Sequence, residues 1–265
     1  MSRLKYTPDM HLACCQFDIA WEDKPANYRR VATLVRSAKL PPSTLLLLPE
    51  MFATGFSMSV AATAEPLEGP TAKFLAELAR EHGLFVVGGA VITDAAIGKP
   101  RNEALAFDPR GQLSAHYAKV YPFSLSREHE YHAAGERVVP FDWSGGRVSP
   151  AVCYDLRFPE LFRRSAAEGA EVLPVIANWP VTREAHWTTL LRARAIENQA
   201  YVAGCNRVGK DGNALVYSGR SQIIDFRGEV LADAGGEETV ICALVDLSSL
   251  RDYRRSLPFL TDMRR

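Results

Sequence analysis

Residues 44–48, TLLLL, form an unbroken apolar run, and this run limits the possible folds more than any other feature. A strand with one face in water alternates apolar and polar residues, whereas a strand covered on both faces does not. The run therefore predicts a strand inside a sheet that carries other layers on both sides. Pro49 and Glu50 follow at once, so a carboxylate lies at the C-terminal end of this strand.

Strand and helix patterns alternate along the rest of the chain. Compact apolar segments predict strands at residues 11–19, 84–92, 172–177 and 200–206. Apolar residues at helical spacing predict helices at residues 27–38, with Asn27 as N-cap, and at 71–82 and 184–199. Residues 102–121 and 221–232 each predict a hairpin about an Asp-x-Arg-Gly turn. This order predicts an α/β fold of two similar halves.

The length of 265 residues, 47% of them hydrophobic, is enough for one domain with a large core. We expect a single domain over residues 1–265. Residues 251–265 are polar and show no helical or strand periodicity, so they are expected to form a C-terminal tail.

The charge and cysteine content of the chain limit its possible binding partners and its cellular compartment. Basic and acidic residues number 31 each, so no net field attracts nucleic acid or an anionic membrane. The N-terminus has no apolar signal segment, and no apolar run approaches the ~20 residues of a membrane span. Five cysteines without metal-ligand spacing favour the reducing cytoplasm.

The segment 146–161, GRVSPAVCYDLRFPEL, places Cys153 where an apolar strand stops and a helix begins. Pro159 is tolerated in the first turn of that helix, because an N–H there would have no partner. A thiol on such a turn lies beside backbone N–H groups and a helix N-terminus, which favour a thiolate and a developing oxyanion. The position is typical of a nucleophile, although a single cysteine is more often a small buried hydrophobe.

Glu50 and Lys119 are expected near Cys153. Glu50 ends a buried strand, Lys119 lies near the end of a hairpin strand, and ligand sites gather at the carboxyl ends of strands. A carboxylate can take the thiol proton, and an ammonium can stabilise the thiolate and the oxyanion. Together the three groups would form an acyl-transfer site, whereas each charged residue alone is usually a solvated surface group.

Four ordered runs strengthen this interpretation. They are residues 45–56 (LLLLPEMFATGF), 117–136 (YAKVYPFSLSREHEYHAAGE), 151–163 (AVCYDLRFPELFR) and 177–209 (ANWPVTREAHWTTLLRARAIENQAYVAGCNRVG). With these runs, almost the whole chain resembles the nitrilase superfamily of carbon–nitrogen hydrolases. The resemblance puts the catalytic glutamate, lysine and cysteine of the family on Glu50, Lys119 and Cys153.

A second family glutamate falls on Glu128, seven residues before Gly135, with Glu130 as the alternative. The resemblance also implies a four-layer α-β-β-α sandwich that pairs through its helical layers into an eight-layer homodimer. It implies no metal and no organic cofactor.

Within the superfamily, the CYDLRFPELFR run and the NWPxxRxxHWxxLLxARAIENQ pattern are most similar to the omega-amidase branch. That branch hydrolyses the terminal amide of 2-oxoglutaramate or 2-oxosuccinamate to the 2-oxo dicarboxylic acid and ammonia. The implied reaction is attack by Cys153, with Glu50 as base and then acid, and hydrolysis of the resulting thioester by water. Lys119 and the backbone N–H of Tyr154 would hold the oxyanion, and Glu128 would orient Lys119.

A 2-oxo acid carries a carboxylate remote from its amide, so a cationic clamp is expected. Arg157, Arg183 and Lys210 are the candidates, and arginine is preferred for its bidentate geometry. Aromatic candidates for the pocket wall are Phe56, Phe123 and Trp179. The spacing of His116, His129, His132 and His186 does not favour a tetrahedral metal site.

Two alternatives remain open. The first is another enzyme of the same type, a nitrilase or an N-carbamoyl amide hydrolase, which would share the nucleophile and differ in its products. The second is a catalytically idle binding or scaffold protein, which the presence of all three reactive residues disfavours. The predicted assembly is a homodimer in which residues 251–259 of one subunit pack on or near the active-site mouth of the other, as the family's pairing and the aromatic and arginine residues of this segment suggest. The alternative is that this segment folds back on its own chain.

Overall fold

The computed structural model describes residues 10–93 and 95–264, and two mixed sheets form its centre. In strand order, the first sheet is β16 (Thr239–Val245), β1 (Met10–Gln16), β2 (Leu45–Leu47), β4 (Phe85–Ile92), β5 (Arg101–Phe107) and β6 (Leu113–Ala118), with β3 (Ala64–Glu65) beside β4. The second is β15 (Val230–Asp233), β14 (Gln222–Ile224), β11 (Tyr201–Cys205), β10 (Val172–Ile176), β8 (Gly146–Val148) and β7 (Phe141–Trp143), with β9 (Ala151–Val152) beside β10. Strands β12 (Val208–Lys210) and β13 (Val216–Ser218) form a separate hairpin.

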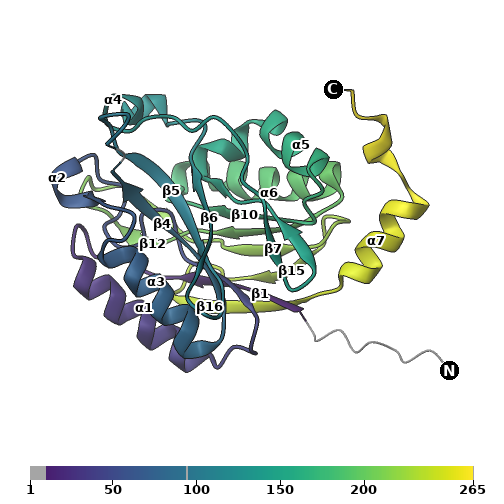
Figure 1. The fold of residues 1–265 in the computed structure, drawn as a ribbon, viewed down its shortest axis with the longest axis horizontal. Coiled ribbons are helices and arrows are strands. Elements are labelled where there is room, and N and C mark those ends of the chain that lie inside the picture. The colour runs from purple at the N-terminus through teal and green to yellow at the C-terminus, as the bar shows by residue number, and fades with distance from the viewer. Residues whose placement is uncertain (1–9, 94, 265) are drawn as a thin grey trace.

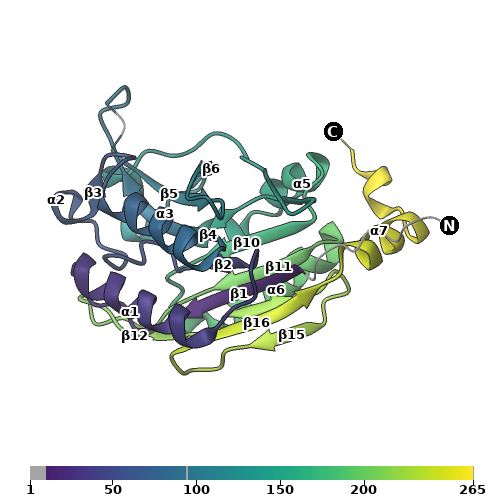
Figure 2. The same ribbon diagram turned by 60° about the horizontal axis from the view of Figure 1, so that its bottom comes forward.

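Helices cover the outer face of each sheet (Figure 1, Figure 2). The first sheet carries α1 (Lys24–Ala38) and α3 (Pro70–His82), and the second carries α5 (Pro159–Ala167) and α6 (Glu184–Asn198). The remaining helices are α2 (Val60–Thr63), α4 (Glu128–Tyr131), α7 (Leu247–Ser256) and the 3₁₀ turns η1 (Ser124–Ser126), η2 (Cys153–Arg157), η3 (Val181–Arg183) and η4 (Phe259–Asp262). No helix in the described part of the chain is long and apolar enough to cross a membrane.

The apolar run of β2 is buried on both faces, as its sequence predicts. Leu45 and Leu47 belong to the core between the sheets, whereas Leu46 and Leu48 belong to the core under α1 and α3. Residues of β1 alternate between the same two cores. The α/β class and the α-β-β-α order of layers are therefore confirmed.

The two halves of the chain repeat one topology. Strands β1, β2 and β4 are parallel and are followed by the antiparallel hairpin of β5 and β6. Strands β9, β10 and β11 are parallel and are followed by the antiparallel pair β14 and β15. The two hairpin turns match as well, because Asp108 and Asp225 each accept backbone N–H bonds from residues two and four positions later.

The expected start of the first helix, at Asn27, is wrong. Helix α1 begins at Lys24, because Asp23 caps it by accepting a hydrogen bond from Ala26 N at 3.0 Å, and Pro25 fits the first turn. Asn27 is therefore inside the helix, where its amide bonds the backbones of Ala20 and Ala53.

The expected irregular tail is also wrong for residues 251–256, which belong to α7. Asp246 caps this helix by accepting from Ser249 N at 3.0 Å, and Leu250 is fully buried. Tyr253 packs on Phe226 of the same chain, with ring centroids 5.0 Å apart. The sequence shows no clear helical pattern here, because Leu247 and Leu250 are the only side chains of α7 that are buried in the core.

Candidate active site

Cys153 stands at a sharp turn between β9 and the 3₁₀ turn η2. Its φ of 47° lies in the left-handed region, a strained conformation for a residue with a Cβ. Asp155 supports the turn, because its Oδ2 accepts from Val152 N at 2.9 Å and from the Tyr117 hydroxyl at 2.8 Å. Its Oδ1 accepts from Tyr121 N at 2.9 Å, and burial raises its pKa to about 6 against these bonds. Asp155 thus ties the cysteine turn to the segment that follows β6.

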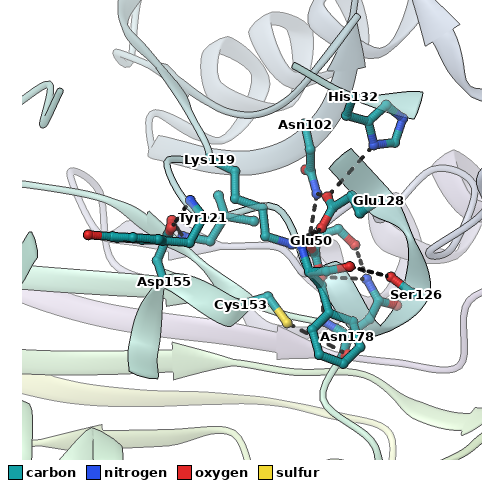
Figure 3. A network of polar contacts seen from close by, with 12 residues as sticks. Glu50, Asn102, Lys119, Tyr121, Ser126, Glu128, His132, Cys153, Asp155 and Asn178 are labelled. Carbon is teal, nitrogen blue, oxygen red and sulfur yellow. Dashed lines mark hydrogen bonds and ion pairs between the residues drawn. The ribbon is translucent and has the colours of Figure 1, made fainter. Parts of the chain in front are cut away.

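Glu50, just beyond β2, is fully buried and has hydrogen-bond partners from both sheets (Figure 3). Its Oε1 accepts from Lys119 Nζ and from Asn102 Nδ2, each at 2.8 Å. Its Oε2 accepts from Asn178 N at 2.9 Å, at the end of β10. The carboxylate is therefore fixed by donors from both halves of the molecule.

Lys119 joins Glu50 to Glu128. Its Nζ donates to Glu128 Oε2 at 2.8 Å, and Phe123 N donates to the same oxygen at 2.6 Å. Glu130, the alternative in the sequence, is exposed and pairs with Arg127. The sequence-predicted residues Glu50, Lys119 and Glu128 thus form one buried network, and Cys153 lies beside it (Figure 3).

The charges of the network stabilise one another. Burial opposes the charge on Lys119, but Glu128 and Glu50 outweigh it and raise the lysine pKa. Burial also opposes the charge on Glu128, yet Lys119, His132 and Asn102 hold the pKa of that carboxyl at about 2. At neutral pH Lys119 is therefore an ammonium and Glu128 a carboxylate, and the ammonium lies between Glu128 and Glu50.

The thiol itself is protonated. Burial and the Glu50 carboxylate raise the pKa of Cys153 well above its usual range, although the Lys119 ammonium opposes them. Burial and two carboxylates therefore outweigh the nearby positive charge and the helix N-terminus, which by themselves favour a thiolate. Any attack by Sγ requires a base to remove the proton, which places this task on a neighbouring carboxylate.

In front of Cys153 lies a cavity of about 480 Å³. Six predicted residues line it, namely Phe56, Phe123, Tyr154, Arg157, Trp179 and Arg183. The guanidinium of Arg157 lies 4.8 Å from the ring centroid of Trp179, and that of Arg183 lies 5.6 Å from that of Phe123. Within the described chain, neither arginine forms an ion pair with a carboxylate. Lys210, the third predicted cation, does not line the cavity.

The β12–β13 hairpin contributes a further wall that sequence reasoning missed. Asp211 lines the cavity, but its carboxylate already accepts from Asn213 N, Leu215 N and the Tyr217 hydroxyl, at 2.8 to 2.9 Å. Tyr217 in turn packs 4.7 Å from the buried guanidinium of Arg207. The acid on this wall is therefore engaged in holding the hairpin.

The sequence profile of the family described as carbon-nitrogen hydrolase matches residues 11–255. The chain belongs to the carbon–nitrogen hydrolase family. A 2-oxoglutaramate amidase of Bacillus subtilis is 36% identical to it over 96% of this chain and 97% of that protein. The omega-amidase YafV of Escherichia coli is 37% identical over the same two shares, 96% and 97%. The crystal structure of XC1258 from Xanthomonas campestris, a CN-hydrolase superfamily protein with an arsenic adduct in its active site, is 34% identical, covers 97% of this chain and 98% of that chain, and has a TM-score of 0.91.

Two asparagines of this carbon–nitrogen hydrolase were not singled out from its sequence. Asn102 Nδ2 donates to both Glu50 Oε1 and Glu128 Oε1, each at 2.8 Å. Asn178 follows β10 directly, and its backbone oxygen accepts from Cys153 Sγ at 3.8 Å. The strand-end rule that pointed to Glu50 could have found Asn178 as well.

The histidines of this hydrolase do not gather. Among the described residues, no three His, Cys, Asp or Glu side chains are placed to hold a metal ion. His116 contacts Glu103, His186 contacts Arg157, and His132 lies buried behind Glu128. The arrangement around Cys153 therefore offers a thiol, carboxylates and an ammonium, which suit acyl transfer.

Proposed function

We propose that this carbon–nitrogen hydrolase is an omega-amidase. It hydrolyses the terminal amide of short 2-oxo dicarboxylic acid monoamides, 2-oxoglutaramate and 2-oxosuccinamate, to the acid and ammonia. The observation that carries this proposal is the position of Cys153 between a buried Glu50–Lys119–Glu128 network and a cavity with two arginines that lack a carboxylate partner. The names of the bacterial relatives, 2-oxoglutaramate amidase and omega-amidase, support the same substrate class.

In the first step, Cys153 Sγ attacks the amide carbon. Glu50 takes the thiol proton, the S–C bond forms, and the carbonyl oxygen becomes an oxyanion. Lys119 has three N–H donors, and Glu50 and Glu128 use two of them. The third donor and the backbone N–H of Tyr154 hold the oxyanion. Glu50 then passes its proton to the nitrogen, the C–N bond breaks, and ammonia leaves.

In the second step, water hydrolyses the thioester. Glu50 takes a proton from the water, whose oxygen attacks the acyl carbon, and Lys119 and Tyr154 N again hold the oxyanion. The C–S bond breaks, and the proton returns from Glu50 to sulfur. The acid leaves and the free thiol is restored.

The two arginines hold the other end of the substrate. The guanidinium of Arg157 lies over the ring of Trp179 and its Nη2 donates to His186 Nδ1 at 3.2 Å, so its orientation is restricted before a ligand arrives. A guanidinium of this kind binds a carboxylate through two parallel hydrogen bonds. Arg183, over Phe123, is the second cation available to the 2-oxo acid group. Phe56, Phe123 and Trp179 form the apolar walls around the carbon chain.

The deciding experiment measures ammonia release from a panel of substrates, with Cys153→Ala as the blank. The panel contains 2-oxoglutaramate, 2-oxosuccinamate, glutamine, a simple aliphatic amide, a nitrile and an N-carbamoyl amino acid. Preference for the 2-oxo amides supports the proposal. Turnover of the nitrile or the carbamoyl compound above the 2-oxo amides favours the alternative enzymes, and no turnover with no acyl adduct on Cys153 favours a binding protein.

We also propose that the protein is a homodimer in the cytoplasm and that its two subunits pair through their helical layers. Exposed apolar side chains on these parts of the chain include Ile196 of α6 and Phe259 beyond α7. Such residues are typical of interface anchors. Light scattering of the purified protein tests the dimer directly.

A further inference from the structure

His132 lies directly behind the charged network, in the loop after α4. Its side chain is 1% exposed, and its Nδ1 lies 3.7 Å from Glu128 Oε1 (Figure 3). In the described part of the chain, neither ring nitrogen has a hydrogen-bond partner within normal distance. The backbone at this position is fixed, since His132 N donates to Glu128 O at 2.8 Å.

A buried imidazole in this position is unfavourable for stability alone. An unpaired buried donor or acceptor carries its full desolvation penalty, and an apolar ring of similar size would fill the same space without it. In the described part of the chain, the ring lies against the charged carboxylate of Glu128. A polar ring at this position is therefore explained by its interaction with the carboxylate of Glu128.

Glu128 is held unevenly by its other partners. Oε2 accepts two short hydrogen bonds, from Lys119 Nζ at 2.8 Å and Phe123 N at 2.6 Å, whereas Oε1 accepts one, from Asn102 Nδ2 at 2.8 Å. His132 Nδ1 lies on the Oε1 side. A donor there keeps the carboxylate from turning away from Lys119.

We propose that His132 is a positioning residue whose Nδ1–H holds Glu128 Oε1, so that Oε2 stays on Lys119 and the ammonium stays aimed at the reacting carbonyl. This role rests on the proposed amidase mechanism, because His132 touches neither Cys153 nor the cavity. It acts through Glu128 and Lys119 on the oxyanion and hardly on the binding of the substrate. The lowered pKa of Glu128, to which His132 contributes after Lys119, agrees with a donor at this position.

Three substitutions at residue 132 separate the donor from the packing. His132→Asn keeps a donor close to the place of Nδ1, His132→Gln puts one close to the place of Nε2, and His132→Phe fills the space with no donor. With 2-oxoglutaramate, His132→Phe and His132→Gln should lose about tenfold in kcat, with KM changed less than about twofold. His132→Asn should keep most of kcat.

The melting midpoint tells this role from a purely structural one. Because Nδ1 lies 3.7 Å from Glu128 Oε1, beyond the length of a good hydrogen bond, and phenylalanine fills the same space, the midpoint of His132→Phe should change little while kcat falls. A structural histidine would instead lower the midpoint and leave kcat of the folded protein normal. Equal kcat in all three variants, or a loss in Asn equal to the loss in Phe, overturns the proposal.

A second measurement does not depend on the substrate. Iodoacetamide alkylates Cys153, and mass spectrometry of the peptide that contains Cys153 gives its rate separately from that of the exposed Cys242. Because Lys119 opposes the raised pKa of the thiol, a displaced ammonium should slow alkylation of Cys153 several-fold in His132→Phe and hardly in His132→Asn. If 2-oxoglutaramate is not a substrate but this pattern holds, the proposed function is wrong and the role of His132 stands. If hydrolysis is normal and alkylation is the same in every variant, the role of His132 is wrong.

Discussion

The two sides of Cys153 differ in how their charges are paired. Behind it, Glu50, Lys119 and Glu128 are buried, and Lys119 Nζ lies 2.8 Å from a carboxylate oxygen of each glutamate. In front of it, Arg157 and Arg183 are half-buried and rest on aromatic rings without a carboxylate. Folding completes the first set of charges, whereas the second set needs a ligand to complete it.

This difference predicts two kinds of mutant. Groups that folding fixes before the substrate arrives stabilise the transition state, so their loss lowers kcat. Cations that meet the substrate carboxylate bind ground state and transition state alike, so their loss raises KM. The network also carries folding energy, because removing one member of a buried ion pair leaves its partner uncompensated.

Cys153→Ala should lower kcat by roughly 10⁴-fold or more, because no other group can form the thioester. The fold should be retained, since alanine fits the turn and no described ion pair depends on Sγ. Circular dichroism checks the fold, and ammonia release checks the activity. Activity close to wild type in this variant would remove the nucleophile from the mechanism.

Lys119→Met should lower kcat by roughly 10²–10³-fold, because a donor to the oxyanion is lost. It should also lower the melting midpoint, because Glu50 and Glu128 are then buried side by side without their cation. Lys99→Met is the matched control, since Lys99 lies at the surface, where its Nζ donates to His129 O. A Lys119→Met protein with full kcat would break the distinction between the two sides of Cys153.

The network should also give the fold an acid-sensitive contribution to stability. Glu128 titrates at about 2 in the folded protein and at its ordinary 4.5 when unfolded. Its stabilisation, about 3 kcal/mol, is therefore present above pH 4.5 and is lost as the pH falls toward 2. Urea unfolding between pH 2 and 6 should show a smaller slope in Glu128→Gln than in the wild type, and the remaining slope comes from groups such as Asp246, whose pKa is also lowered to about 2. Glu130→Gln, at an exposed ion pair, should change the slope little.

Arg157→Gln tests the opposite side. KM for 2-oxoglutaramate should rise about tenfold with kcat nearly unchanged, because a charge-assisted hydrogen bond to the carboxylate is lost. KM for a simple aliphatic amide should stay the same. Arg164→Gln, on the exposed face of α5, is the control. A fall in kcat with unchanged KM would place Arg157 with the network instead of the substrate.

Local sequence signals predicted the chemistry better than its surroundings. Glu50 and Cys153 each follow an apolar strand, so a few neighbouring residues identify them. Asn102 could not be found this way, because β5 meets Glu128 only once the chain has folded. His132 is four residues after Glu128, but this spacing alone does not show that its ring is buried against that carboxylate. The protonated thiol also depends on burial and charge from distant segments, which no local pattern contains.

The sequence also did not predict the short strands β12 and β13 or the polar helix α7. Strands β12 and β13 have three residues each, which is too short for the alternation of a strand to be recognised in the sequence. Helix α7 was expected to be an irregular tail, because only Leu247 and Leu250 of its side chains are buried. Both elements are held by contacts across the chain, such as Arg251 to Glu171 and Tyr217 to Asp211.

The smallest expected effect concerns the residues beyond α7, which lie far along the chain from both sides of Cys153. Phe259 is 57% exposed and Leu257 39% exposed, so these two side chains gain little from their own subunit. If residues 251–259 lie near the active-site mouth of a second subunit, deleting residues 257–265 should weaken the dimer about tenfold and raise KM about twofold. The deletion keeps α7 and its contact with Phe226, and Leu244→Ala, on the exposed edge strand β16, controls for loss of an apolar side chain alone. Light scattering over a dilution series and steady-state kinetics give the two numbers. An unchanged dimer with unchanged KM means that this segment neither seals the interface nor shapes the cavity, and that the cavity in front of Cys153 is complete within one chain.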